Sequence, residues 1–231
     1  MTARDQVLSK IKHNLDRATD LDGNNPAIER IEAHQANLIP SRGRLTGDQL
    51  IDLFCDEAKR VNATITRVDH FESVPNSVGA YLREHQLPAK IKLAPHPRLK
   101  SLDWQQTTSL MVADGRADGD DPISVSLALG GVAETGTLVM ASGPDTPTSL
   151  NFLPLDHIVV LDAEDLAGDY EAVWAKIRAK AKEAGQSGQM PRTVNWITGP
   201  SRTADIEQTL LLGAHGPQRL HIILVDKEGD G

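Results

Sequence analysis

Short apolar runs separated by polar turns recur along the second half of the chain, and each has the length of a β-strand. Several are almost continuous Ile, Val and Leu, which is typical of strands that are covered on both faces. One longer segment, from about Asp169 to Lys182, has apolar residues at helical spacing, with Val173 and Ile177 among them. The predicted strands are residues 123–127, 138–141, 157–161, 193–197 and 220–225. This pattern predicts an α/β fold with a mainly parallel sheet and helices on its faces.

A strand–helix–strand unit precedes these strands. Residues 64–68 alternate between polar and apolar as a strand does, residues 73–86 have helical spacing, and residues 90–94 alternate again. A further apolar run follows at residues 109–113. The same α/β pattern therefore extends into the first half of the chain.

A helix is also predicted before this unit. Thr46 and Gln49 have the spacing of a capping box, in which each side chain binds the other residue's backbone N–H, and the helix should run to about Val61. The lone cysteine, Cys55, lies beside its apolar stripe, where a small thiol packs without reacting.

The N-terminal segment reads as two helices outside the core pattern. Its first apolar stripe is followed by a turn-rich break at residues 20–25, after which Pro26 suits the first position of a second helix. We expect a helical N-terminal arm at residues 1–44 and a single α/β domain at residues 45–231. The arm would pack either on the domain or on a second subunit of a homo-oligomer. The two apolar stripes consist of Val7, Leu8, Ile11 and Leu15, and of Ile28, Ile31 and Leu38.

Composition narrows the class of protein. With 39% hydrophobic and 24% charged residues, the chain has the make-up of a globular protein with a substantial core. A formal net charge of -8 without a cluster of Lys and Arg argues against nucleic acid as a partner. The start of the chain reads as an amphipathic helix and not as a signal peptide, and no apolar run is long enough to span a membrane. We therefore expect a cytoplasmic protein.

Several kinds of site are disfavoured by the residues themselves. One cysteine excludes an internal disulfide and any iron–sulfur cluster held by several thiolates of this chain alone. The histidines are scattered and lack metal-ligand spacing, so no metal site is predicted. The acidic stretch at residues 114–121 lacks the ligand spacing of a calcium loop and reads as a solvated turn. The chain also has no motif for nicotinamide or ATP.

The stretch ITGPSRTADIE, residues 197–207, predicts a strand, a tight turn and a helix N-terminus. Such a junction presents backbone N–H groups to a phosphate or carboxylate, and Gly199, Ser201, Arg202 and Thr203 are its candidate anion-binding residues. Alternatively, Ser201 or Thr203 caps the helix. For Arg202 the alternative is an internal salt bridge, with Asp205 or Glu207 as its partner.

The stretch GGVAETGTLVM, residues 130–140, places the carboxylate of Glu134 between glycines at a turn before a strand. Partial burial there would raise its pKa toward that of a general base, and Glu134 could also act as a nucleophile. The alternative is that Glu134 accepts hydrogen bonds from turn N–H groups and only holds the loop. Thr135, Gly136 and Thr137 could supply hydroxyls and close backbone approach to a ligand, although Gly136 could serve only to allow a positive φ angle.

Two histidines complete the candidate site. His215 lies in the turn at residues 213–217 and could act as acid, base or ligand, or could be structural. Gly216 follows it and would let a ligand approach the backbone. His157 opens the strand HIVVL and is expected to donate to the backbone or to line the edge of the pocket.

The motifs ETGT, GPSRTADIE and GxHGP, in that order, resemble the lactate utilization protein C family, a group of LUD-domain proteins. The resemblance covers about residues 124–225. It implies the three-layer fold shared by sugar-phosphate isomerases and acyl-CoA transferases. It also implies a component of a cytoplasmic multi-protein system that oxidises L-lactate to pyruvate.

In such a system this chain would carry no cofactor, and iron–sulfur clusters would belong to its partner proteins. The resemblance makes Glu134 and His215 the candidate catalytic residues, and adds Asp205 to the residues around a small carboxylate or phosphate-containing ligand. The alternatives are a stand-alone isomerase- or acyl-transferase-like enzyme that uses Glu134, and a purely structural subunit.

The relative position of the two main motifs depends on strand direction. Ligands of open α/β sheets bind at the carboxyl ends of parallel strands, and the strand at residues 193–197 should deliver Ser201 to that edge. Glu134 precedes its strand, so it reaches the same edge only if the strand at residues 138–141 runs antiparallel to its neighbours or the turn folds over. We expect Glu134 to face a pocket between the two turns.

Overall fold

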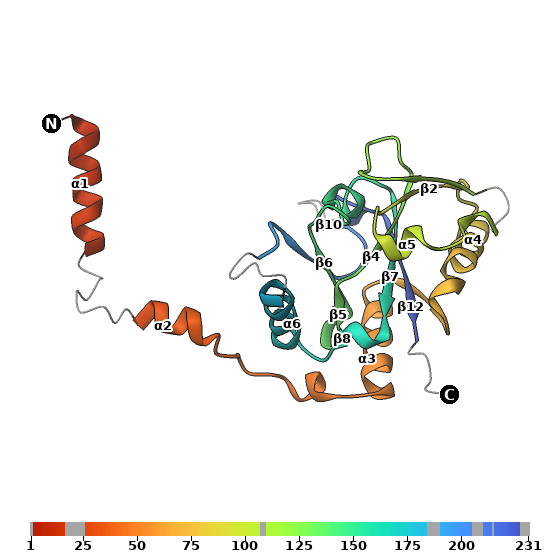
Figure 1. Ribbon diagram of the computed structural model, residues 1–231, viewed down its shortest axis with the longest axis horizontal. Coiled ribbons are helices and arrows are strands. Elements are labelled where there is room, and N and C mark those ends of the chain that lie inside the picture. Colours follow the sequence, from red (N-terminus) through yellow and green to blue (C-terminus); the bar gives the residue numbers. More distant parts are fainter. Residues whose placement is uncertain are drawn as a thin grey trace. The chain divides into compact units, whose positions relative to one another are not determined.

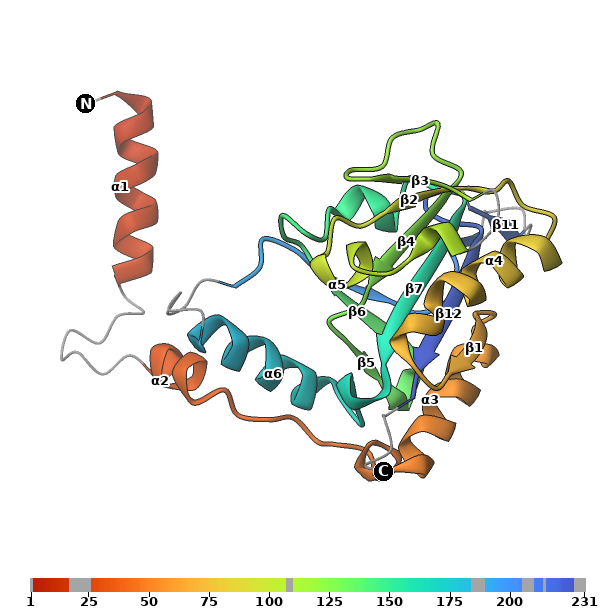
Figure 2. The same ribbon diagram turned by 45° about the vertical axis from the view of Figure 1, so that its right-hand side comes forward.

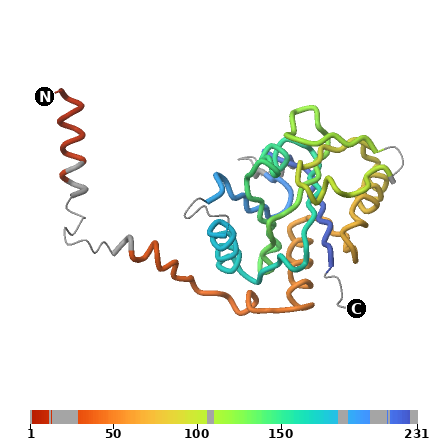
Figure 3. Tube along the Cα trace, viewed as in Figure 1, coloured from red at the N-terminus to blue at the C-terminus, as the bar shows by residue number. Residues whose placement is uncertain are grey.

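The computed structural model describes residues 2–16, 26–106, 110–183, 190–204, 210–213 and 215–226 (Figure 3). The chain divides into two compact units, Met1–Leu38 and Ile39–Gly231. The first unit contains the two predicted helices, α1 (Ala3–Asp16) and α2 (Pro26–Ala33). On α1 the apolar residues Val7, Leu8 and Ile11 are exposed. The predicted break at residues 20–25 lies outside the described residues.

The second unit begins before the 44/45 boundary expected from the sequence. A 3₁₀ turn, η1 (Ser41–Arg44), contains the buried Gly43. A Cβ added to Gly43 would lie 3.3 Å from the carbonyl oxygen of Gly168, so the two backbones are in close contact. Residues 39–44 therefore belong to the packing of the second unit.

A six-stranded sheet forms the centre of the second unit, in the order β1-β12-β7-β4-β2-β3 (Figure 1). Every pair of neighbours in it is parallel, which confirms the predicted α/β fold with a mainly parallel sheet. Its central strands are buried along their length, as their continuous apolar sequences predicted. The strands are β1 (Thr64–Val68), β2 (Lys90–Leu93), β3 (Met111–Asp114), β4 (Ile123–Leu127), β7 (Asp156–Asp162) and β12 (Arg219–Val225).

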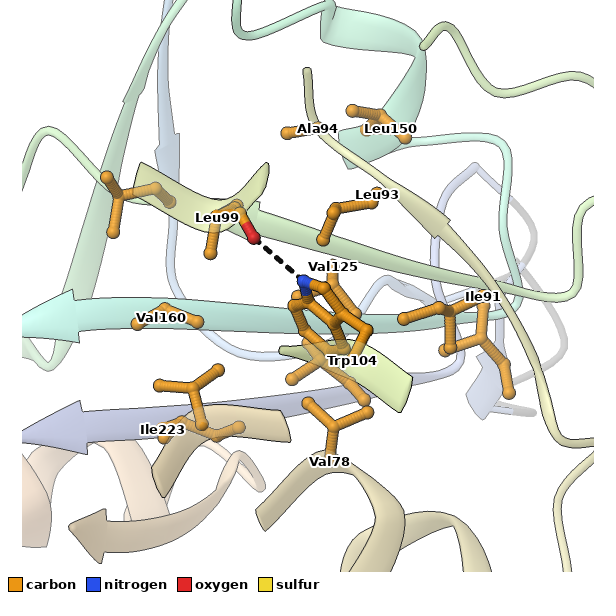
Figure 4. Close-up of a cluster of buried hydrophobic side chains, with 14 of the residues drawn as sticks. Val78, Ile91, Leu93, Ala94, Leu99, Trp104, Val125, Leu150, Val160 and Ile223 are labelled. Atoms are coloured by element: carbon orange, nitrogen blue, oxygen red, sulfur yellow. Dashed lines mark hydrogen bonds between the residues drawn. The ribbon is translucent and has the colours of Figure 1, made fainter. Parts of the chain in front are cut away.

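One face of this sheet is covered by α4 (Val74–Glu84), α5 (Pro97–Lys100) and the turn η3 (Trp104–Gln106). Figure 4 shows the buried cluster between them, with Trp104 near its centre and with Val78 of α4 and Ile223 of β12 among its members. The indole Nε1–H of Trp104 donates to the carbonyl oxygen of Leu99 at 2.7 Å. This large side chain is therefore buried without leaving its polar atom unpaired.

The other face is covered by α3 (Asp48–Arg60) and by a second sheet of four strands, in the order β8-β5-β6-β9. In this sheet β6 runs antiparallel to both β5 and β9. Helix α6 (Tyr170–Glu183) packs on its outer side, and α6 and α4 lie on opposite sides of the strands (Figure 2). The four strands are β5 (Gly130–Val132), β6 (Thr137–Ala141), β8 (Leu166–Ala167) and β9 (Val194–Ile197).

The second sheet corrects one expectation. The strands predicted at residues 138–141 and 193–197 exist as β6 and β9, but they do not belong to the parallel sheet. The connection between β5 and β6 is the short turn η4 (Ala133–Thr135) with Gly136, which is far too short for a parallel crossover. The remaining short elements are η2 (Phe71–Ser73), η5 (Thr148–Asn151), η6 (Ala163–Asp165), β10 (Arg202–Ala204) and β11 (Leu210–Leu212).

The capping residues predicted from the sequence are confirmed at one helix and wrong at another. At α6 the carboxylate of Asp169 accepts a hydrogen bond from the backbone N–H of Ala172 at 2.9 Å, an N-cap that agrees with the predicted start. At α3 the capping box predicted from Thr46 is wrong, because the N-cap is Gly47, with φ of 58° and no side-chain cap. No helix among the described residues has the length and apolar character needed to cross a lipid bilayer.

Candidate functional site

After β9 the structure has strand β10 where the sequence predicts a helix N-terminus, so that start of the helix is wrong, and residues 205–209, on which the predicted helix continues, lie outside the described residues. Strand β10 pairs antiparallel with β11, with Arg202 opposite Leu212 and Ala204 opposite Leu210. This ladder pairs the backbone groups that a helix N-terminus would leave free. The expectation of a helix dipole aimed at an anion therefore fails at this turn. Thr203 lies in β10, and the suggested partners Asp205 and Glu207 lie outside the described residues.

Arg202 binds the end of α3. Its Nη2 donates to the carbonyl oxygen of Val61, the C-cap residue of that helix, at 2.6 Å. A cation is favourable at a helix C-terminus, where the dipole is negative, and the guanidinium also pairs a carbonyl that the helix leaves free. In the structure Arg202 thus holds the turn against α3.

Both motif turns pack on this same helix end. Gly136 has φ of 62°, and a Cβ there would lie 2.6 Å from the Cα of Ala58. Gly199 has φ of 76°, and a Cβ there would lie 3.1 Å from the Cβ of Val61 and would also clash with its carbonyl oxygen. Only glycine meets both demands, a positive φ and no side chain, so these two residues set how closely each turn approaches α3.

A chain of hydroxyl groups joins the two turns. The register that places Leu138 opposite Ile197 brings Thr137 beside Thr198, and their Oγ1 atoms are 2.7 Å apart. Thr137 is also 2.7 Å from the Oγ1 of Thr135, which lies 3.0 Å from the hydroxyl of Tyr170. Tyr170 and Thr198 were not identified from the sequence, because Tyr170 reads as part of the apolar stripe of its helix.

The third motif turn packs against the second through its backbone. The N–H of Ser201 donates to the carbonyl of Pro217 at 2.8 Å, and the N–H of Gly213 donates to the carbonyl of Ser201 at 3.0 Å. A Cβ added to Gly216 would lie 3.4 Å from that of Ser201. His215 is exposed.

The turns at residues 198–201 and 215–217 line an open cavity of about 220 Å³. It lies at the amino ends of the parallel strands, because His157 is near the start of β7 and Leu220 near the start of β12. The expected placement at the carboxyl edge is therefore wrong, since β9 delivers Ser201 from the second sheet. The cavity is lined by Asn151, Phe152, His157, Trp196, Ile197, Thr198, Gly199, Pro200, Ser201, His215, Gly216, Pro217 and Leu220.

Three larger openings among the described residues contain none of the motif residues. The smallest of the three, of about 300 Å³, lies between β1 and α4, where Thr66 and Ala80 line it. The other two are larger still. One, of about 870 Å³, lies beside the far end of β6 and the end of α6, where Ser142 and Lys180 line it. The other, of about 780 Å³, lies at the carboxyl ends of β7 and β12, where Arg98 and Asp162 form an ion pair at 2.5 Å. The small cavity is the candidate site because the turns of two motifs line it and the third is linked to it through Thr198.

His157 is the most deeply buried polar residue of the cavity, with 1% of its surface exposed. Its Nε2 lies 2.6 Å from the Oγ of Ser126, and its Nδ1 has no hydrogen-bond partner among the described residues. Burial lowers the pKa of His157 to about 3, so the imidazole is neutral near pH 7. The sequence placed His157 at the pocket edge, and the structure buries it.

Glu134 lies apart from the cavity lining. The residue as a whole is 7% exposed, and its backbone N–H donates to the carbonyl of Gly168 at 3.1 Å. Among the described residues no hydrogen bond or ion pair of the Glu134 carboxylate is found. Of the predicted site residues, the structure thus brings Gly199, Ser201, His215 and Gly216 together. Thr137 and Thr135 connect to them through Thr198.

Metal-binding groups are not assembled in the described part of the chain. There, no group of three or more His, Cys, Asp or Glu side chains is placed to hold a metal ion. Cys55 is buried in α3, and burial raises the pKa of its thiol, which favours the unreactive protonated form.

Several known proteins are similar to this chain in sequence. A lactate utilization protein C from Halalkalibacterium halodurans is 25% identical over 191 residues, which cover 78% of this chain and 81% of that protein. A lactate utilization protein C from Exiguobacterium is 32% identical over 126 residues, and this alignment spans about half of that relative's length, 53%.

The fold also matches a solved structure. The crystal structure of a DUF162 family protein from Deinococcus radiodurans superposes with a TM-score of 0.57 at 19% identity, covering 78% of this chain and 99% of that one. The model of the LUD domain family matches residues 51–225, which include both sheets and all the turns of the cavity. The chain therefore belongs to the LUD domain family.

Proposed function

We propose that this chain is a component of a lactate utilization system that oxidises L-lactate to pyruvate, and that its cavity binds the small carboxylate. Two relatives that carry the name lactate utilization protein C support the first part. The second part rests on one observation, the meeting of motif turns around a cavity of about 220 Å³ that contains a buried histidine.

The size and lining of the cavity suit such a ligand. At roughly 30 Å³ for each water molecule, the volume accommodates a molecule of a few heavy atoms, such as a three-carbon acid. The hydroxyl of Ser201 and the imidazoles of His157 and His215 line it as polar groups, and Trp196 and Phe152 supply apolar walls. This combination of a mainly apolar wall with a few polar groups is typical of small-molecule sites.

Oxidation of L-lactate to pyruvate releases two electrons and two protons, and the electrons require an acceptor. The single cysteine of this chain cannot form an iron–sulfur cluster with thiolates of its own. We therefore propose iron–sulfur partner proteins in the cytoplasm as the electron acceptors, with this chain binding the substrate.

We assign the candidate acid–base role at the cavity to His215, and we propose that Glu134, which does not line the cavity, acts on the site through the hydroxyl groups of Thr135, Thr137 and Thr198. His215 lines the cavity, and Glu134 starts the turn whose threonines reach Thr198 by hydrogen bonds. His215→Asn and Glu134→Gln should each abolish lactate oxidation by the assembled system while leaving the melting temperature nearly unchanged. A Glu134→Gln protein that melts much lower but keeps full activity per folded molecule would make Glu134 a residue that only holds the loop.

Calorimetric titration of the isolated chain with L-lactate and with pyruvate tests the binding step. Ser201→Ala should weaken binding by about 1.5 kcal/mol, roughly tenfold, if its hydroxyl donates to the carboxylate. Ser77→Ala is the matched control, since the Ser77 hydroxyl lies on α4, away from the cavity, and has no partner among the described residues. Absence of measurable binding of either acid would refute the proposed ligand.

A further inference from the structure

We propose that His157 and Ser126 form the oxygen-binding group of this cavity, with Ser126 holding the imidazole so that its Nδ1–H donates to a carboxylate or keto oxygen of the ligand. This inference rests on the proposed function in that it concerns the same cavity, and it narrows the ligand to molecules that present an acceptor oxygen there.

The two residues come from neighbouring parallel strands. In the register of β4 and β7, Ser124 lies opposite His157, and Ser126 follows two residues later on the same face of β4. The hydroxyl of Ser124 has a different partner and donates to the carbonyl of Leu150 at 2.7 Å. Ser126 instead lies 2.6 Å from the Nε2 of His157. The sheet therefore gives the histidine one dedicated hydrogen-bond partner.

This pairing selects the tautomer of His157. Ser126 is 1% exposed, and within the described residues its hydroxyl has no hydrogen-bond partner other than the Nε2 of His157. A buried hydroxyl keeps its proton in a hydrogen bond, so Ser126 donates and Nε2 accepts. A neutral imidazole that accepts at Nε2 carries its proton on Nδ1. Burial holds the pKa of this ring well below neutral pH, which agrees with the neutral form.

The Nδ1–H then lacks an acceptor in the protein. Four buried side-chain atoms without a partner are found in the described part of the chain, on Ser77, His157, Asn195 and His221. Of these four residues, His157 is the one that lines the cavity of the motif turns. Because buried polar groups are normally paired, we infer that a ligand oxygen in the cavity supplies the acceptor for this donor, whose residue lines the cavity.

The chemistry of this group selects the ligand class. Nδ1–H donates and cannot accept, and a neutral ring adds no positive charge. A carboxylate or 2-oxo oxygen satisfies it, whereas an ammonium group in the same place would meet a second donor. We therefore expect acetate and pyruvate to bind and ethylammonium, a cation of similar size, to be rejected.

Nuclear magnetic resonance of the full chain with ¹⁵N-labelled histidine tests the tautomer before any ligand is added. Two-bond ¹H–¹⁵N spectra should show a protonated Nδ1 and an unprotonated Nε2 for His157, with its signals assigned by their loss in His157→Asn. Adding pyruvate or acetate should shift the Nδ1 signal. A protonated Nε2 in the free protein overturns the inference, as does an Nδ1 signal unmoved when either acid saturates the cavity.

Two serine variants separate recognition from folding. Ser126→Ala should weaken acetate or pyruvate binding by about tenfold, the usual size for one hydrogen bond to a charged group, because the ring loses its fixed tautomer. Ser124→Ala, on the same strand and face, should leave that affinity unchanged. Equal losses in the two variants would overturn the inference.

These measurements separate the proposed role of His157 from the proposed function in lactate oxidation. If acetate shifts the Nδ1 signal while L-lactate and pyruvate do not bind, the oxygen-binding role of His157 stands and the proposed lactate function fails. If no carboxylate at millimolar concentration shifts it, the role of His157 fails.

Discussion

Lowering the pH from 7 to 5 should destabilise this protein through two buried histidines, His157 and His221. Burial lowers the pKa of His157 to about 3, and burial followed by the charge of His85 lowers that of His221 to about 4. In the unfolded chain both rings titrate near 6.5. Between these values the unfolded state binds protons that the folded state does not bind. The stabilisation is therefore complete above about pH 6.5 and is lost as the pH falls toward the folded pKa values.

The size of the effect follows from the pH interval. Each proton contributes about 1.4 kcal/mol for each pH unit, so between about pH 6.5 and pH 5 each histidine should lower the free energy of unfolding by about 2 kcal/mol. The two together should lower it by about 4 kcal/mol, which is a large part of the stability of an ordinary domain.

Urea unfolding at pH 7 and pH 5, followed by tryptophan fluorescence, measures this loss. His157→Asn should lose about 2 kcal/mol less than the unmutated chain between the two pH values, because one titrating ring is gone. Val159→Ala, a fully buried neighbour on β7, is the control. It should be less stable at both pH values by roughly 2 kcal/mol yet show the full acid-induced loss. The reasoning is refuted if His157→Asn keeps the full loss as well.

Three further substitutions or truncations test the packing. Gly136→Ala should lower the free energy of unfolding, measured in urea titrations, by about 3 kcal/mol, because alanine there would have a positive φ and its Cβ would clash with α3. Gly119→Ala is the control and should leave that free energy nearly unchanged, because a Cβ at Gly119 meets no other atom. Arg202→Met should cost about 1 kcal/mol of stability by removing the hydrogen bond to Val61, with carboxylate affinity measured by calorimetry left unchanged. A chain starting at Ile39 should unfold in one cooperative transition at the unaltered midpoint, and a lower midpoint would show that the N-terminal unit stabilises the domain.

Sequence patterns located the strands well but could not assign them to sheets. The run at residues 194–197 has the same local character in either sheet, and its place beside β6 depends on pairing with Leu138 and Val139, far away in the chain. The short turn between β5 and β6 was a usable signal, since it forces antiparallel pairing. The length of this turn therefore predicts that β6 runs antiparallel to β5. It does not predict that β9 pairs with the other edge of β6.

Sequence patterns predicted which turns lie together but not the polar groups that line the candidate cavity. Gly199, Ser201 and Gly216 do meet, because turn residues mark the ends of strands. The helix N-terminus expected at Ser201 is instead the start of strand β10, because residues that cap a helix can also lead into a strand, and the outcome depends on pairing with Leu210–Leu212. The sequence could not show that His157 pairs with Ser126, because the two residues are 31 positions apart and meet only when β4 and β7 are aligned.

The last turn of α3 is a platform on which the two glycine turns pack. Gly136 sits on Ala58 and Gly199 on Val61, and Arg202 is tied to that same Val61. Adding or deleting one residue within α3 ahead of Ala58 would rotate this platform by about 100° and shift it by about 1.5 Å, moving both contact points at once. Substitutions on the exposed side of α3 leave the platform in place. Changes in the length of this helix, even far from the cavity in sequence, would therefore misalign its walls.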